Sequence, residues 1–424
     1  TAYEIPKRDW SSDVCSSDLG VPAVPVFWID AEDHDWNEVR SCGVYDAELN
    51  PVQIALGTPA GAGELPVARV RLDDSITEAV GRLEATLPAT EFTPGLLDAV
   101  RRIYKTGNGM ADAFGMWLES VLGHRGLVVF DSSNPAAKPL VSDVFFREVD
   151  RAGETARLAA AAGDALVAHG YHAQVTPQAG QAALFHLDGA RVCIMADDAS
   201  RYRDLAKTKP AEFSPNVLLR PIVQDTLFPT ACYVAGPNEL AYLGQLRDIY
   251  ASFGVPMPLM HQRATATILD ANAMRFLARH DVPLDALRAQ DEHALNQLLA
   301  AQVPRAVDAS FEEATRTMTE RMNSVAHAVT ALDTTLEGAA RSAAGRMLDD
   351  LKKLHGKVLQ AMKRKDETLR RQFTHAQAQA FPNGHPQERE IGFVYFLNQY
   401  GPGLVERLSD ELTLDMGIHW VVSI

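Results

Sequence analysis

Apolar positions in the first third of the chain follow two alternating patterns, short uninterrupted runs and helical stripes. The run at 24–29 is β-branched and aromatic without alternation, which is typical of a strand buried on both faces. In residues 75–87, apolar side chains step by four, three and four, which predicts a helix. Further helices are expected at 94–104 and 111–122, and a second strand at 127–130. Such alternation over residues 20–150 predicts βαβ units and a parallel sheet, the first part of a Rossmann-like α/β core.

A different pattern follows between residues 151 and 210. The alanine-rich stretch 155–169 predicts a helix, and Asp188-Gly189 between two apolar runs is the strongest short signal for a β-hairpin. These features predict a small inserted α+β subdomain. From 211 to 307 the alternation of strands and helices returns, so this stretch is expected to complete the core. The strands expected in these two regions are 182–187, 191–195, 231–235 and 265–269.

Residues 312–380 have the pattern of one long charged helix. Apolar side chains step by four and three residues from Met318 to Leu336, and the pattern resumes from Met347 to Met362, as in a coiled coil. Such a length exceeds that of helices packed within globular domains, and one helix cannot bury its own apolar seam. The pattern therefore predicts a C-terminal coiled-coil domain over 308–424 that joins two copies of the chain. A break is expected at 381–386 and an αα return at 390–412.

Composition narrows the class of protein. The 424 residues, 46% of them hydrophobic, suffice for two or three domains with their own cores. A net charge of −15 argues against nucleic acid or an anionic membrane as the main partner, because both select basic surfaces. No stretch of the sequence approaches the roughly 20 apolar residues of a transmembrane helix. The four cysteines are scattered, without disulfide or zinc-site spacing, which fits a cytoplasmic protein.

The most informative polar positions follow the first apolar run: Asp30, Glu32, Asp33, His34 and Asp35 fall within six residues. In open α/β sheets, ligands bind outside the carboxyl ends of the strands. Crowded carboxylates beside an imidazole offer acid, base or metal-ligand roles. The alternative is helix capping by Asp33 or Asp35. Capping needs one or two acids, so the size of the cluster favours a functional site. Asp33 and His34 are its catalytic candidates, and Glu32 and Asp35 are candidates for substrate binding.

Two later strand ends carry further candidates for substrate binding. Asp131 follows the run 127–130, where its carboxylate can bind an amine or hydroxyl group or simply close an Asx-turn. Gly236 and Glu239 follow the run 231–235 and open a helix. Free backbone N–H groups at a helix N-terminus bind anions, whereas Glu239 at that end favours an ammonium group.

The segment 213–225 combines Asn216, Arg220 and Gln224. If residues 217–227 are helical, Asn216 caps the helix, and Arg220 and Gln224 lie four residues apart on one face. Arg220 can then grip a carboxylate through two parallel hydrogen bonds. The alternative is an ion pair of Arg220 with Asp225 or Glu239 that holds two loops together.

Five stretches, in order along the chain, resemble signature segments of the bacillithiol biosynthesis cysteine-adding enzymes. They are 25–36 (Pro-Val-Phe-Trp-Ile-x-x-Glu-Asp-His-Asp-Trp), 126–131, 213–225, 236–242 and 387–389, and the similarity runs from about Gly20 to the C-terminus. The resemblance implies a class I synthetase-like Rossmann core with inserted subdomains and a C-terminal coiled coil that dimerises. It also implies a reaction that joins cysteine to glucosaminyl-malate and completes bacillithiol.

By the same resemblance, Gln387 and Arg389 lie near a second nucleotide pocket between core and coiled coil. The alternative, which we favour, is that this segment only caps the return helix. Gly236 is the other candidate for cofactor binding, because its turn offers backbone N–H groups. The sequence does not identify the cofactor; an adenine nucleotide is the class that the resemblance suggests.

Residues 1–19 do not fit the rest of the chain. The sequence begins with Thr1, and this segment has no periodicity and a near-repeat of Ser-Ser-Asp, which is typical of translated adapter sequence. It also lacks the apolar core of a signal peptide. Members of the resembled family carry a long segment with a Gly-Pro-rich nucleotide-binding turn before the first strand, and nothing here matches it. We therefore expect an N-terminally truncated chain whose active site lacks a part.

The resemblance thus implies a ligase of bacillithiol synthesis that acts on small molecules, and the coiled-coil pattern predicts that it is a homodimer. His34 or Asp33 would deprotonate the attacking amine, while Arg220 and Asn216 position substrate. Glu239 and Asp131 would hold amino or hydroxyl groups. We expect Asp33, His34, Arg220 and Glu239 to converge on one cleft that is open on one side.

Two alternatives remain open at this point. One is a metal-dependent hydrolase that uses the Glu32-Asp33-His34-Asp35 cluster, although adjacent residues rarely point at one ion. The other is a non-catalytic coiled-coil dimer whose core binds a nucleotide.

Overall fold

The computed structural model describes residues 23–301, 305–413 and 415–424. The segment 1–19, which we expected to be foreign, lies outside the described residues. The chain divides into two compact units. Unit 1 extends to Ala266 and includes Glu390–Val422, whereas unit 2 consists of Thr267–Arg389 and Ser423–Ile424.

Parallel strand pairs form the frame of unit 1, as the alternating pattern predicted. Strand β1 (Val26–Ile29) pairs in parallel with β4 (Val128–Asp131), with Val26 opposite Val128 and Ile29 opposite Asp131. Strand β8 (Cys232–Ala235) pairs in parallel with β9 (Leu259–Gln262). Helices α3 (Ser75–Thr86), α4 (Thr93–Ile103) and α5 (Met110–Leu122) connect β1 to β4, each within one residue of its predicted bounds. The predicted α/β, Rossmann-like fold class is confirmed.

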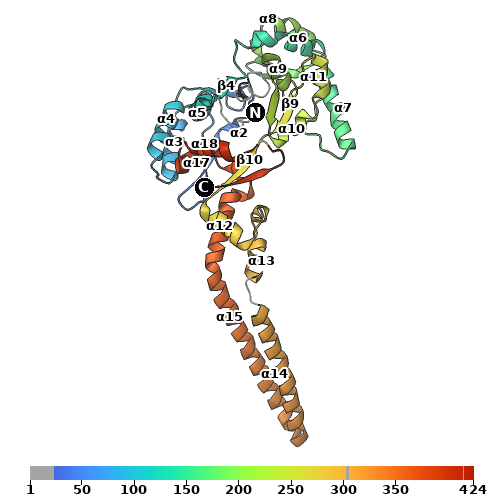
Figure 1. The fold of residues 1–424 in the computed structure, drawn as a ribbon. Helices are drawn as coiled ribbons and strands as arrows, with labels where there is room; N and C mark the ends of the chain where they lie inside the picture. Colours follow the sequence, from blue (N-terminus) through green and yellow to red (C-terminus); the bar gives the residue numbers. More distant parts are fainter. Residues whose placement is uncertain (1–22, 302–304, 414) are drawn as a thin grey trace. The chain divides into compact units, whose positions relative to one another are not determined.

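Shorter elements surround this frame (Figure 1). The antiparallel pair β2 (Ser41–Tyr45) and β3 (Pro51–Ala55) follows α2 (Trp36–Val39). The predicted return at 390–412 is two helices, α17 (Phe393–Tyr400) and α18 (Leu404–Glu411). In α17, the fully buried Asn398 donates to the Pro88 carbonyl and accepts from Thr93 Oγ1, both at 2.8 Å, so this late segment is part of unit 1. The chain passes from one unit to the other within β10 (Thr265–Leu269), between Arg389 and Glu390, and within β11 (His419–Ser423).

The predicted inserted hairpin is present, with a third strand that the sequence pattern did not reveal. Strands β5 (Gln181–Asp188) and β6 (Ala190–Met195) turn at Gly189, whose φ of +71° favours glycine. Strand β7 (Phe213–Pro215) pairs with β5 on its other edge. It escaped prediction because it has only three residues and ends in proline. The helices of this region are α6 (Ser142–Asp150), α7 (Glu154–Ala168) and α8 (Arg203–Thr208).

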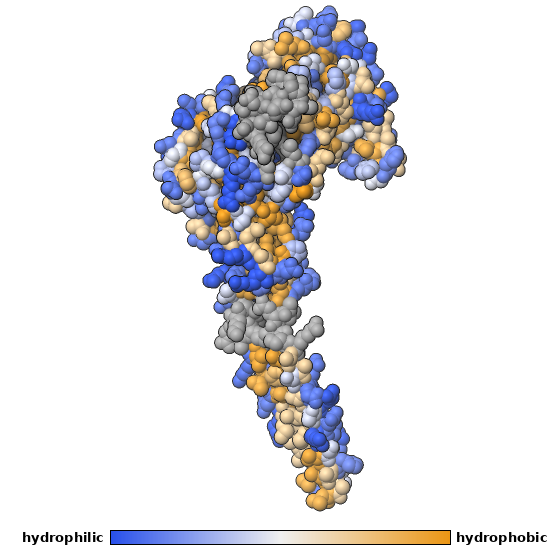
Figure 2. Space-filling view, viewed as in Figure 1, coloured by the Kyte–Doolittle hydropathy of each residue, from blue (hydrophilic) through white to orange (hydrophobic). Residues whose placement is uncertain are grey.

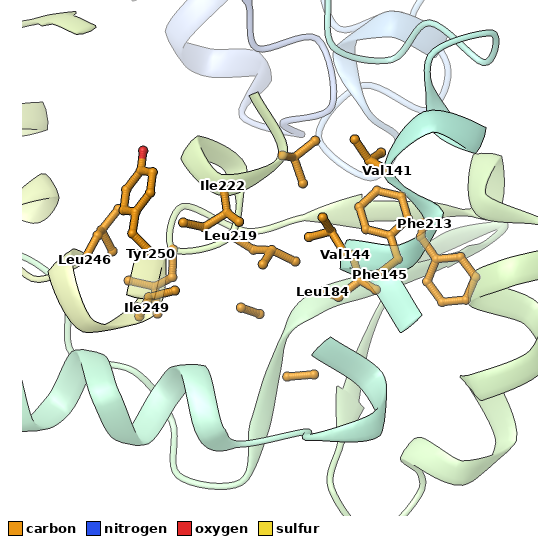
Figure 3. Packing of buried hydrophobic residues seen from close by; sticks show 14 of the residues in the cluster. Val141, Val144, Phe145, Leu184, Phe213, Leu219, Ile222, Leu246, Ile249 and Tyr250 are labelled. Atoms are coloured by element: carbon orange, nitrogen blue, oxygen red, sulfur yellow. The ribbon is translucent and has the colours of Figure 1, made fainter. Parts of the chain in front are cut away.

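One cluster of buried hydrophobic residues joins the inserted subdomain to the second half of the Rossmann-like domain (Figure 3). Phe145 and Phe213 stack with ring centroids 6.3 Å apart, and both are fully buried. The same cluster contains Leu219 and Ile222, at and after the start of α9 (Arg220–Leu227). It also includes residues of α10 (Pro237–Leu243) and α11 (Arg247–Phe253). Burial of this cluster fixes where α9 begins, and with it the position of Arg220.

The predicted single helix over 312–380 is wrong. Helix α14 (Arg305–Leu332) ends at Asp333, and after a 3-10 turn (Thr334–Leu336) helix α15 (Glu337–Ala380) runs back beside it (Figure 1). The Asp333 carboxylate accepts from the Thr335 amide and hydroxyl, both at 2.8 Å, and so caps the 3-10 turn that leads into α15. His355 Nε2 lies 3.0 Å from Asp308 Oδ1, which shows that the helices are antiparallel. The two helices that carry the apolar repeats therefore pair with each other within one chain.

This hairpin still exposes apolar side chains. Val325, Leu332 and Leu336 are 46%, 87% and 40% exposed. Figure 2 shows hydrophobic surface along one side of the hairpin and at its tip. The remaining helices of unit 2 are α12 (Ala271–His280), α13 (His293–Ala301) and the short α16 (Gln387–Glu390). In the part of the chain that the structure describes, no helix is long and apolar enough to cross a membrane.

Candidate functional site

The polar cluster lies in the loop that leaves the carboxyl end of β1. Its last member, Asp35, is a helix cap: its Oδ1 accepts from the Asn37 amide at 3.0 Å and the Glu38 amide at 3.4 Å. Behind the cap, Trp36 is buried and donates from Nε1 to the Gly57 carbonyl at 3.1 Å. The capping interpretation therefore describes Asp35, whereas the other acids have different partners.

Two arginines hold the centre of the cluster. Arg220 places Nη1 2.5 Å from Asp30 Oδ2 and Nη2 3.6 Å from Asp33 Oδ2. Arg191 places Nη1 3.7 Å from Asp33 Oδ1. Burial alone would raise the pKa of Asp33, but the Arg220 guanidinium and the His34 amide outweigh burial, so the pKa lies below its ordinary value. Asp33 is therefore ionised at neutral pH. At Asp30, burial prevails over Arg220 and raises the pKa.

His34 lies between an acceptor and a donor. Its Nδ1 is 3.1 Å from Asp33 Oδ1 and 3.2 Å from Nη1 of Arg191. A guanidinium only donates, so Nδ1 bonds Arg191 in the tautomer protonated at Nε2 and bonds Asp33 in the tautomer protonated at Nδ1. In the second tautomer the Nε2 lone pair is free, which is the form that a general base requires. The side chain is 52% exposed and open to a ligand.

Arg191 comes from β6 and was missed by sequence reasoning. Its guanidinium lies 4.2 Å from the centroid of the Phe185 ring, and Nη2 donates to the Pro215 carbonyl at 3.2 Å. These contacts bury the side chain to 9% exposure and fix its head beside Asp33 and His34. In the sequence Arg191 reads only as the first polar residue of a strand.

Glu32 does not face the cluster. Its Oε1 is 2.5 Å from Nζ of Lys138, and both side chains are about 5% exposed or less. Lys138 Nζ also donates to the Phe213 carbonyl at 3.3 Å. This buried ion pair ties the loop after β1 to β7, the strand before Asn216. Burial raises the pKa of Glu32 even against the Lys138 ammonium. Sequence reasoning also missed Lys138, which follows the second strand end in the turn Lys138–Val141.

The segment 213–225 delivers Arg220 as predicted, with a different local structure. Asn216 Oδ1 accepts from the Leu218 amide at 2.9 Å and the Leu219 amide at 3.3 Å, and the helix begins later, at Arg220. Arg220 pairs with Asp30 and Asp33, so neither predicted alternative ion pair, with Asp225 or Glu239, describes it. Asp225 accepts instead from the Tyr250 hydroxyl at 2.5 Å. Gln224 is buried, and its Nε2 donates to Asp225 at 3.3 Å.

The turn after β8 leads into α10, and Tyr242 of this helix lies within electrostatic range of Arg220 and Asp30. Glu239 Oε2 accepts from the Gly236 amide at 2.8 Å, which caps α10 and occupies the N–H expected to bind an anion. Tyr242 connects this helix to the cluster. Its pKa is raised to about 12 by burial and by the Glu239 carboxylate, against the opposing charge of Arg220. The charges of Glu239 and Arg220 therefore both affect the pKa of Tyr242, although Glu239 itself caps α10.

The remaining candidates have structural partners. Asp131 Oδ1 accepts from the Ser133 amide and hydroxyl, both at 2.7 Å, as in the predicted Asx-turn. In unit 2, Gln387 Oε1 accepts from the Ile268 amide, and Nε2 donates to the carbonyls of Ile268 and Gln379. The Gln387 amide thus binds backbone and does not favour nucleotide contact. Arg389 lies beside it in α16.

A cavity of about 1050 Å³ adjoins the cluster within unit 1. Its lining is mainly apolar and comes from β1, α3, α4, α5 and α18, with the carboxylates of Asp30, Asp33, Asp35 and Glu38 among the lining residues. Small-molecule pockets of proteins are mostly apolar with a few polar groups and reach about this size. In the described residues, no three or more His, Cys, Asp or Glu side chains are grouped to hold a metal ion. The metal-hydrolase alternative therefore has no support here.

Comparison with known proteins agrees with this architecture. Residues 12–264 match the family model described as "Bacillithiol biosynthesis BshC, N-terminal Rossmann-like domain", and residues 266–424 match "Bacillithiol biosynthesis BshC, C-terminal coiled-coil domain". A protein of Salinibacter ruber named "Putative cysteine ligase BshC" is 33% identical over 96% of this chain and 76% of its own length. Proteins of the same name from Chlorobaculum tepidum and Symbiobacterium thermophilum are each 30% identical. They cover 92% and 95% of this chain and 73% and 77% of their own lengths.

Proposed function

The chain belongs to the bacillithiol biosynthesis BshC family, and from this premise we propose that it is a ligase that joins cysteine to glucosaminyl-malate. In the last step of bacillithiol synthesis, the amine of glucosaminyl-malate would attack the carboxyl carbon of a cysteine that reaches the site in activated form. The carbon–nitrogen bond forms as the bond between that carbon and the activating group breaks, and the activating group leaves. The name of the relatives supports the ligase class and cysteine as a substrate. The observation that carries the assignment to a site is the Asp33–His34–Arg191–Arg220 cluster at the carboxyl end of β1.

In this proposal His34 is the general base. An ionised Asp33 is a weak base, because the pKa of its carboxyl is lowered by Arg220. The same carboxylate can accept from Nδ1 of His34 and so hold the tautomer whose Nε2 takes a proton from the attacking amine. When Nε2 is protonated, Asp33 stabilises the imidazolium. Asp33 thus acts through His34.

The other polar residues bind and orient substrate. Arg220 and Asn216 position it, because the same turn carries both residues and the capping bonds of Asn216 use its Oδ1. Asp131 and Glu239 hold hydroxyl or amino groups of the sugar through the carboxylate oxygens that their capping bonds do not use. The apolar lining of the cavity beside Asp33 can accommodate the less polar parts of a substrate.

We also propose that the chain is a homodimer through the α14–α15 hairpin. Its support is the hydrophobic strip that remains exposed after the two helices have packed on each other, with Leu332 at 87% exposure. Large exposed apolar patches mark interaction surfaces.

Reconstitution in cells tests the proposed reaction. Cells that accumulate glucosaminyl-malate and lack this last step would receive the chain, and thiol-labelled bacillithiol would be measured by mass spectrometry. We expect bacillithiol to appear and Asp33→Asn to lower it at least about tenfold, because the amide no longer holds the basic tautomer. Asp112→Asn, which removes an exposed charge paired with Arg71, is the matched control. Absence of bacillithiol with folded protein present would contradict the proposal.

A further inference from the structure

Two polar side chains extend the β1–β4 ladder on one face. The ladder pairs Ile29 with Asp131, and the Ser132 amide donates to the Ile29 carbonyl at 3.2 Å, which brings Asp30 level with Ser132. Side chains alternate between the faces of a strand. Asp30 therefore shares the face of Trp28, and Ser132 shares that of Phe130, whose ring lies 5.1 Å from the Trp28 ring. Adjacent strands are about 4.8 Å apart, and both residues directly follow the paired strands, so we infer that the two polar side chains are neighbours.

Asp30 and Ser132 each have a buried polar atom without a hydrogen-bond partner in the described chain, and so does Trp28. Within the described chain, Asp30 Oδ1, Ser132 Oγ and Trp28 Nε1 are buried and make no hydrogen bond. Ser132 is 5% exposed and Trp28 is 3% exposed. Buried polar atoms in folded proteins nearly always have a partner, and exceptions gathered at one place call for an explanation. A ligand group with several donors, placed between the carboxylate and the hydroxyl, supplies one.

The charges around this point select the kind of ligand. Asp30 and Asp33 pair with Arg191 and Arg220, so two negative charges face two positive charges at this place. Nη1 of Arg220 is committed to Asp30 at 2.5 Å, but Nη2 is 3.6 Å from Asp33 and retains donor capacity. A dicarboxylate would add two uncompensated negative charges to this partly buried site, and a diamine two positive ones. A ligand that carries one charge of each sign preserves the balance.

We propose that this place is a subsite for an α-amino acid. Its ammonium lies between Asp30 Oδ1 and Ser132 Oγ, and its carboxylate accepts from Nη2 of Arg220. An ammonium offers three donors, enough for both oxygens, and the bond between guanidinium and carboxylate is charge-assisted. The inference rests on the proposed function, in which the amino acid is cysteine, and it adds the residues that hold it. The carboxylate then lies on the side of Arg220 that faces Asp33, next to His34.

Calorimetric titration of the full chain with three thiols tests the subsite. L-cysteine carries both charges, 3-mercaptopropionate lacks the ammonium, and cysteamine lacks the carboxylate. We expect L-cysteine to bind the unaltered chain most tightly. Asp30→Asn should weaken L-cysteine binding at least about tenfold, since an ionic partner of the ammonium is lost. It should change the affinity for 3-mercaptopropionate by less than about twofold, because that ligand makes no bond to Asp30.

Ser132→Ala keeps the test decisive if Asp30→Asn fails to fold. It should weaken L-cysteine binding about fivefold, the usual effect of one hydrogen bond. Ser133→Ala is the matched control, because the Ser133 hydroxyl already bonds Asp131. The subsite is refuted if L-cysteine does not bind at millimolar concentrations, if both variants bind it as the unaltered chain does, or if they weaken all three ligands alike. Failure of the proposed function has a different signature: normal, Asp30-dependent cysteine binding without bacillithiol formation.

Discussion

Each unit contains an aspartate–histidine pair that follows a strand, and the two pairs differ in how completely their polar atoms are bonded. In unit 2, Asp270 Oδ1 caps α12, while Oδ2 accepts from Nε2 of His375 at 2.7 Å and from Gln379 at 3.0 Å. The side-chain Oε1 of Gln379 in turn accepts from the Asp270 backbone amide. In unit 1, Asp33 Oδ1 accepts from the His34 amide at 2.6 Å, but the contacts of Asp33 with Arg220 and Arg191 are 3.6 and 3.7 Å long, and His34 is half exposed.

The difference separates a structural network from a functional one. A polar network whose members are all bonded fixes one conformation, and the Asp270–His375 pair joins α12 to α15 in that way. The long contacts of Asp33 with the two arginines and the exposed His34 leave bonding capacity that a ligand can use. Similar residue types therefore have different roles, and the number of committed hydrogen bonds distinguishes them better than the residue names do.

Removal of the α14–α15 hairpin should have the largest effect, because we expect this part of unit 2 to hold two chains together. Because Asp308 and His355 are in contact, residues 309–354 can be replaced by a short Gly-Ser linker without displacing the rest of the chain. The resulting protein keeps Glu390–Val422, which belongs to unit 1. Light scattering should show a dimer for the full chain and a monomer for the shortened one. A shortened chain that stays dimeric would place the interface elsewhere.

Lys138→Met should give the largest loss of stability in unit 1. It leaves Glu32 buried without its cation, which costs about 3–5 kcal/mol in a fully buried pair. The double variant Glu32→Leu with Lys138→Met removes both charges and should recover most of this loss. Urea unfolding of the single and double variants measures the effect. Equal stability of Lys138→Met and the unaltered chain would show that the pair does not anchor the loop after β1.

The Asp270–His375 pair should make unit 2 sensitive to pH on both sides of neutrality. Burial opposes ionisation of Asp270, but the hydrogen bonds from His375 and the Ala273 amide lower its pKa from 3.8 to about 2. This stabilisation is present above about pH 4 and is lost as the pH falls toward 2. The hydrogen bond to Asp270 raises the pKa of His375 above 6.5, so its contribution is present below that pH and is lost as the pH rises past the raised value.

Hydrogen exchange of α12 amides across this pH range measures the effect. Asp270→Asn should remove both losses, and the loss at low pH is at most about 2 kcal/mol. An unaltered pH profile in this variant would mean that the pair adds nothing to stability.

Asp35→Ala should have the smallest effect. It removes the cap of α2 and should lower the free energy of unfolding by about 1 kcal/mol, whereas Asp35→Ser should retain most of it. Urea unfolding of the two variants separates capping from other roles. Equal loss in both would show that the carboxylate does more than cap.

The sequence predicted the parts of the site that local patterns carry. The cluster after β1 and the position of Arg220 after a polar turn follow from short-range features. Arg191 and Lys138 were missed because their roles depend on the Pro215 and Phe213 carbonyls, which only the folded chain brings near. The break at Asp333 was missed because the Asp-Thr-Thr sequence contains neither glycine nor proline. An aspartate cap and the packing of α14 on α15 produce the turn.

The most direct test of the central claim compares His34→Ala with His375→Ala, in bacillithiol yield and in thermal unfolding. His34→Ala should lower the yield about 100-fold or more, the usual effect of a lost general base, and shift the unfolding midpoint by no more than about 2 °C. His375→Ala should lower the midpoint by several degrees and reduce the yield only in proportion to the folded protein. An unchanged yield in His34→Ala, or a loss that merely follows its unfolding, would contradict the account.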